Sequence, residues 1–356
     1  MEALLAVALT CHLLLINLAM TGPLCCVWLD VRARRQADVS IQIVGVRLAQ
    51  WAFAALILVL VSGGLLVCVL WLMGDQRLFL AARRIPGRIS NGAWEVLFSV
   101  VCLGFYTWWA ARHRPERRLL CWLQRLLAIL AATNLMYHFP PLFTILWQLQ
   151  REPLPATDLL DGAAFRAMML TAEVLAFTFH YWLASLATSA MAVLLLAERT
   201  TDEYGTFHES LMIAGGRVAL AASLLQIPTG VWLLSVLPST QQTALLGNDL
   251  MATLLLVAAL IATWFLLQQL AAVAWGDTQD GGTWRTMALL CCIVLLMSGT
   301  LVRSRRIGQP SSGQKLESTS QKHVRDNHYF PLATRAESRS ISRRRSIGAS
   351  SRDICG

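Results

Sequence analysis

Stretches of about 20 consecutive apolar residues recur along this sequence, and they limit the folds open to the chain more than any other feature. They lie near residues 3–29, 48–73, 90–111, 118–139, 171–197, 209–237, 246–275 and 283–302. A helix of about 20 apolar residues is long enough to cross a hydrocarbon core of roughly 30 Å. The sequence therefore predicts an all-α, polytopic membrane bundle of about eight transmembrane helices.

The composition agrees with a membrane protein. Only 14% of the 356 residues are charged, against roughly 25% in soluble domains. The first apolar run starts with Glu2 and is too long for the core of a signal peptide, so we expect it to be retained. The nine cysteines form no paired metal-binding motif, and Cys25 and Cys26 read as small apolar side chains.

Basic loops predict the orientation of the chain. The segments "DVRARRQADVSIQIVGVR" and "ARHRPERR" are expected in the cytoplasm, which places the N-terminus outside. The segment "GDQRLFLAARRIPGR" carries four arginines yet falls outside by parity, and its pattern favours a short amphipathic helix on the outer surface. We interpret the net charge of +9 as the result of basic segments that set the topology and contact lipid. We expect no nucleic-acid partner.

The chain changes character after residue 302. Residues 1–302 form the predicted bundle, and residues 303–356 are basic, rich in Ser and Arg and without helical periodicity, which predicts a disordered tail. Eight crossings from an outside N-terminus leave this tail outside, whereas the charge rule favours the inside. Either residues 246–275 are not a simple crossing, or the tail is tolerated outside.

Four polar side chains within the apolar runs are expected at one level near the outer face. They are His12, Glu95, His138 and His180, each from a different run. Such groups cost several kcal/mol in a bilayer unless they have a partner, so they are functional candidates. His138 is followed by Pro140–Pro141, where we expect the helix to end and to leave free carbonyls.

Imidazoles from neighbouring helices are common axial ligands of haem in membranes, and a carboxylate can ligate the iron or relay protons. The alternative is that each histidine only hydrogen-bonds a carbonyl on a neighbouring helix. The remaining histidines lie in loops or the tail and are given no role: His113, His208, His323 and His328.

Several segments resemble cytochrome bd quinol oxidase subunit I in order and spacing over about residues 5–240. They are "ALTCHLLLINLAMTGPLCCVWLDVRAR", "WEVLFSVVCLGFYTWWAAR", "ATNLMYHFPPLF", "FHYWLASLATSAMAVLLLAER" and "RVALAASLLQIPTGVWLLSVLP". The resemblance implies that His12 and His180 are axial ligands of separate b-type haems. It also implies that Glu95 is a haem ligand or a proton relay.

The sequence departs from that family in three places. It has one carboxylate in the third run, a short stretch "PSTQQTALLGNDLMAT" without the quinol-binding residues, and no Gly-Arg-Gln-Pro-Trp motif. In that family a methionine two residues after an arginine partners the fifth-helix histidine, so the resemblance implies that Met287, after Arg285, is a possible second ligand for the His180 haem if residues 246–275 do not cross. Met297 is the alternative if they do.

We therefore expect an electron-transfer protein of the cell's inner membrane that binds one or more b-type haems, with quinol as donor and a second membrane subunit or redox partner. The resemblance favours a quinol:oxygen oxidoreductase subunit. The alternatives are a haem-binding anchor that passes electrons on without reducing oxygen, and a non-redox, transporter-like protein. His138 is expected to bond a haem propionate or a freed carbonyl, with ligation as the lesser alternative.

Overall fold

The computed structural model describes residues 2–72, 74–112, 116–151, 158–204, 209–277 and 282–307. These residues form eleven α-helices and one π-helical turn, η1, without any strand. The elements are α1 (Glu2–Gln36), α2 (Val39–Leu72), α3 (Arg77–Arg84), α4 (Pro86–Arg112), α5 (Arg118–Arg151), α6 (Gly162–Met169), α7 (Ala172–Tyr204), α8 (Glu209–Val236), α9 (Ser239–Thr243), η1 (Ala244–Asn248), α10 (Leu250–Ala274) and α11 (Gly282–Ile307). Residues 308–356 of the predicted tail, His113 and His208 lie outside the described residues.

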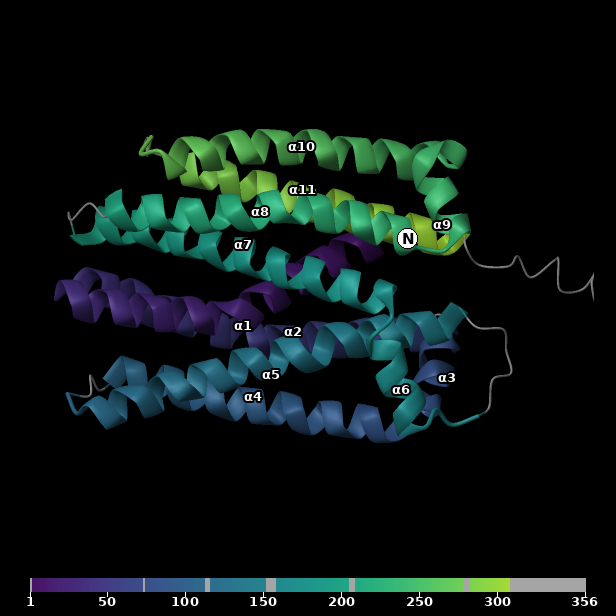
Figure 1. The fold of residues 1–356 in the computed structure, drawn as a ribbon, viewed down its shortest axis with the longest axis horizontal. Coiled ribbons are helices and arrows are strands. Elements are labelled where there is room, and N and C mark those ends of the chain that lie inside the picture. The colour runs from purple at the N-terminus through teal and green to yellow at the C-terminus, as the bar shows by residue number, and fades with distance from the viewer. Residues whose placement is uncertain are drawn as a thin grey trace, which may run out of the picture. The chain divides into compact units, whose positions relative to one another are not determined.

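Eight of these helices are long and apolar enough to cross a membrane: α1, α2, α4, α5, α7, α8, α10 and α11. The predicted all-α bundle of about eight spans is thus confirmed. Figure 1 shows that α3, α6 and α9 lie at the end of the bundle where α1 begins, here called the amino end. The opposite end is called the far end.

The run at residues 246–275 forms a continuous crossing helix. It corresponds to α10, which packs against α8 and α11. The fold therefore matches the alternative in which this run crosses, and α11 ends at the amino end (Figure 1). The side of the membrane that the amino end faces stays a prediction from the basic loops.

The main core lies towards the far end. Its large, fully buried side chains include Leu29, Leu48, Leu103 and Leu194, all in the far-end halves of their helices. By contrast, residues 60–72 of α2, which approach the amino end, are exposed or partly exposed at every position. Packing is therefore close at the far end and more open in the amino-end half.

A smaller apolar cluster closes the amino end. Ala81 of α3, Ile85, Ile145 of α5 and Phe165 of α6 are buried together. The segment "RLFLAARR" is thus an amphipathic helix that buries Ala81 and directs its arginines elsewhere, as its pattern predicted. This packing fixes α3 and α6 across the end of α5.

The expectation that a helix ends at Pro140–Pro141 was wrong. Helix α5 continues through both prolines to Arg151. A proline at position 140 cannot donate to the carbonyl four residues earlier, and that carbonyl, of Met136, accepts a 2.9 Å hydrogen bond from the indole Nε1 of Trp182. A side chain of α7 thus replaces the missing backbone donor, and His138 lies inside a helix.

Candidate functional site

His12 of α1 faces α2. Its Nδ1 lies 3.0 Å from the Ser62 hydroxyl, and its ring packs over the bare backbone of Gly63. A Cβ added to Gly63 would lie 3.2 Å from the His12 Cε1 atom. The glycine therefore leaves the space that the half-buried imidazole occupies.

The bonds around Ser62 select one tautomer of His12. The Ser62 hydroxyl donates to the Val59 carbonyl at 3.1 Å, so its oxygen is left to accept from His12 Nδ1–H. A proton on Nδ1 leaves a free lone pair on Nε2, the form of histidine that binds iron. Partners that hold the other ring nitrogen in this way are typical of metal-ligating histidines.

Ser62 was missed by the sequence analysis. The signal was present, because "SGG" at residues 62–64 interrupts an otherwise continuous apolar run in α2. A hydroxyl followed by two glycines inside a transmembrane helix marks a place where another group approaches the backbone closely.

His180 of α7 has an unsatisfied nitrogen. Its Nδ1 atom is buried and has no hydrogen-bond partner among the described residues. Leaving such a group unpaired costs about 1–3 kcal/mol, unless a group from outside the chain completes the site. The alternative in which His180 bonds a neighbouring carbonyl through Nδ1 is therefore not what this structure shows.

His12 and His180 lie at the same level of the bundle. Two hydrogen bonds join helices α1 and α7: Thr21 Oγ1 lies 2.8 Å from Ser189 Oγ, and Ser185 Oγ donates to Asn17 Oδ1 at 3.0 Å. In both pairs the residue numbers differ by 168, so the two helices run in the same direction with this offset. The numbers of His12 and His180 also differ by 168.

The two histidines do not face each other across the α1–α7 contact. Each lies five residues before a member of the Asn17–Ser185 pair, and five residues turn a helix by about 140°. Each imidazole is thus rotated away from the line that joins the helices, as the His12–Ser62 contact with α2 also shows. This geometry favours two separate ligand sites.

Glu95 and His138 are brought together by the packing of α4 on α5. His138 Nε2 lies 3.7 Å from Glu95 Oε1, and the two side chains are 39% and 33% exposed. Below them, the Asn134 amide donates to the Glu95 carbonyl at 2.7 Å and to the Ser99 hydroxyl at 2.8 Å. The described partner of His138 is thus a carboxylate.

Met287 is placed away from the amino end. It lies in the second turn of α11, which begins at the far end, and it packs against the main core. Because α10 crosses, the condition under which Met287 was expected near His180 does not hold. Met297 lies ten residues further towards the amino end and is 37% exposed.

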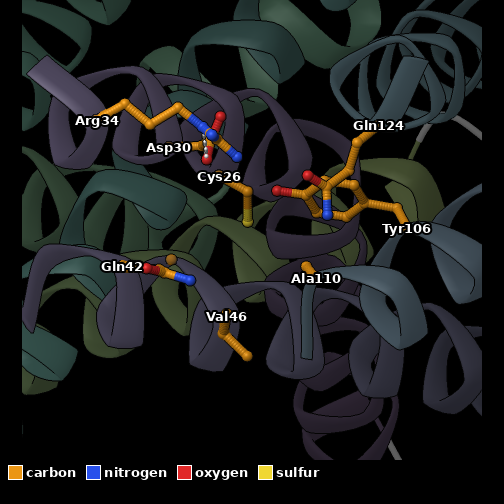
Figure 2. Close-up of a pocket in the computed structure, with 9 residues that line it drawn as sticks. Cys26, Asp30, Arg34, Gln42, Val46, Tyr106, Ala110 and Gln124 are labelled. Atoms are coloured by element: carbon orange, nitrogen blue, oxygen red, sulfur yellow. Dashed lines mark hydrogen bonds and ion pairs between the residues drawn. The ribbon is translucent and has the colours of Figure 1, made fainter. Parts of the chain in front are cut away.

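A polar cavity lies at the far end (Figure 2). It has a volume of about 30 Å³, enough for a water molecule, and its lining includes Asp30, Arg34, Tyr106 and Gln124. Asp30 accepts from Arg34 at 2.9 Å and from Arg125 of α5 at 2.8 Å. At about 1.5 Å per residue, Asp30 is about 27 Å along α1 from His12, so this cavity is separate from the histidine level.

The described residues contain no group of three or more His, Cys, Asp and Glu side chains that could hold a bare metal ion. Single imidazoles presented from separate helices are what a haem iron requires, because the porphyrin supplies the other ligands. Of the two histidines, His12 has the arrangement that an axial ligand uses, with Nδ1 held by a partner and Nε2 left open.

The described residues form an all-α, multi-pass membrane bundle. No protein-family model and no curated protein matches the sequence. Among solved structures, the bd oxidase from Geobacillus thermodenitrificans is similar, with a TM-score of 0.62 and 13% identity over 87% of this chain and 88% of that chain. At this identity the similarity establishes the fold, and the function has to be argued from the residues.

Proposed function

We propose that this protein is a b-type haem electron-transfer subunit of the inner membrane, similar to cytochrome bd quinol oxidase subunit I. The observation that carries the proposal is His12, whose Nδ1 is held by Ser62 so that Nε2 is left to ligate iron. The bd oxidase fold supports it, and so does the position of His180 at the same level of the bundle as His12.

In this proposal His12 holds one haem through Nε2 and His180 holds another. Bound haem b carries single electrons through the ferric and ferrous states of its iron. Ser62 is a positioning residue, since its hydroxyl keeps the imidazole of His12 oriented. The apolar residues of the helices that carry both histidines lower the local dielectric, which tunes the reduction potential of a bound haem.

Glu95 and His138 provide a place for a proton at the same level. Glu95 Oε1 and His138 Nε2 lie 3.7 Å apart, so a proton taken up by His138 forms an ion pair with Glu95 and balances charge when an electron arrives nearby. Both side chains are about one-third exposed, so the packing of α4 on α5 does not enclose them. We therefore assign Glu95 the role of proton relay, with His138 as its partner.

A second candidate is a haem-binding anchor that passes electrons to a partner without reducing oxygen. It is favoured by the short connection between α8 and α10, which holds only α9, η1 and a few linking residues, where the bd family has a long loop for quinol. It is also favoured by the single carboxylate at the histidine level.

The proposal is tested by expressing the full chain and recording reduced-minus-oxidised difference spectra of the membranes. We expect the α-band of b-type haem in the wild type and its loss in the double variant His12→Ala/His180→Ala. A protein that is folded but shows no α-band would overturn both redox candidates. An α-band without quinol-driven oxygen uptake would select the anchor.

A further inference from the structure

Two arginines from different helices converge on one glycine at the amino end. A Cβ built on Gly162, the first residue of α6, would lie 3.5 Å from Arg166 Nη1 and 3.5 Å from Arg88 Nη2. Because both nitrogens are that close to one point, the two guanidinium groups border the same small space. Glycine leaves that space open.

The two guanidinium groups have no carboxylate partner in the described part of the chain. Arg88 lies over the Phe165 ring, 4.8 Å from its centroid, and Arg166 is exposed. The adjacent Asp161 carboxylate is engaged as the cap of α6, accepting from the Ala164 amide at 2.6 Å. Two like charges held this close repel each other, and an anion between them would remove that cost.

The surroundings indicate where the anion comes from. Arg88 is two residues inside the span that begins at Pro86, so the site lies at the membrane boundary. Leu170, the residue that follows α6, is 74% exposed, and Leu159 just before α6 is 70% exposed. Large apolar side chains next to basic ones are the pattern of a surface that contacts both acyl chains and headgroups.

We propose that Arg88 and Arg166 bind the headgroup phosphate of an anionic membrane phospholipid over Gly162. Arginine suits this role because its planar fork makes two hydrogen bonds to a phosphate. The proposal also accounts for Arg88, one of the arginines of the segment "GDQRLFLAARRIPGR", which parity places on the side opposite to the other basic loops. Because Arg88 contacts lipid, it does not need to set the topology.

The test measures binding of phosphatidylglycerol to the delipidated full-length protein in neutral detergent by native mass spectrometry. The double variant Arg88→Gln/Arg166→Gln should weaken binding about 25-fold, the product of about fivefold for each arginine. The matched control Arg77→Gln/Arg83→Gln removes the same charge from α3, and it should change binding less than about twofold.

A variant that leaves the charge unchanged distinguishes binding at Gly162 from attraction of the lipid by the overall positive charge of the amino end. Gly162→Val fills the space between the guanidinium groups, and it should weaken binding as the arginine double variant does. Equal weakening of lipid binding by the two double variants would show that only the overall positive charge attracts the lipid, and it would overturn the proposal. Unchanged binding in Arg88→Gln/Arg166→Gln would also overturn it. Displacement of the lipid by inorganic phosphate at equal concentration would also overturn it, since the source would then be free phosphate.

Discussion

Replacing Gly63 by alanine should disturb haem binding at His12 without weakening the fold. The new methyl group would lie 3.2 Å from His12 Cε1, so the ring has to move by a few tenths of an ångström. The ring is also tied to Ser62 by a 3.0 Å contact, a normal length for a hydrogen bond from a ring N–H to a hydroxyl oxygen. The movement therefore strains or breaks that bond.

The size of the effect follows from that hydrogen bond. A net contribution of about 1 kcal/mol corresponds to about a fivefold loss of haem affinity, and losing a partner that orients a metal ligand typically costs about 10- to 100-fold. We expect about tenfold. The Gly→Ala change itself favours the helix by about 0.5–1 kcal/mol, so stability should not fall.

Gly64→Ala is the matched control, because a Cβ at Gly64 meets nothing within 4 Å. The assay is haem titration of the purified apoprotein, with thermal unfolding recorded on the same samples. Gly63→Ala should lose affinity while Gly64→Ala keeps it. Equal affinities in the two variants would refute the placement of the His12 ligand site against α2.

Three further outcomes are expected. Trp182→Phe should lower the midpoint of thermal unfolding, because the Met136 carbonyl freed by Pro140 loses its hydrogen-bond donor. Adding Pro140→Ala to this variant should restore the midpoint, and a failure to restore it would refute the pairing of Trp182 with that carbonyl. The hydrogen bond from Arg303, aided by the Ala252 amide, lowers the pKa of Asp249. The ionised Asp249 carboxylate therefore stabilises the folded state fully above its unfolded-state pKa, and this stabilisation is lost as pH falls through its folded-state pKa. Asp249→Asn should flatten the acid branch of a pH–stability curve, and an unchanged acid branch would contradict this role of Asp249. His138→Ala should keep most of the haem in a pyridine haemochrome assay, and complete loss would make His138 a ligand.

The spans were predictable because membrane helices are defined by local composition. Every apolar run corresponds to one of the eight crossing helices, and the pattern of residues 77–84 was enough to predict α3. The end of α5 was predicted wrongly for a non-local reason. The donor that carries this helix through Pro140 is Trp182, 46 residues from the carbonyl it bonds, and no rule about prolines contains that information.

The candidate site was only partly accessible from the sequence. Rare polar residues in apolar runs identified His12, Glu95, His138 and His180, because such residues are conspicuous. Their partners were not conspicuous. Ser62 has a common side chain, and only the packing of α1 on α2 gives it a role, while the contact of His138 with Glu95 depends on the register of α4 against α5.

The most direct test of the account is a comparison of the difference spectra of His12→Ala and His180→Ala, each with and without carbon monoxide. The two imidazoles lie at one level but point away from their shared contact, so we expect two haems. His180→Ala should remove a narrow low-spin α-band. His12→Ala should remove a broader, carbon-monoxide-reactive component and spare that band. Loss of the same band in both variants would contradict the account, because one haem would then bridge the two histidines.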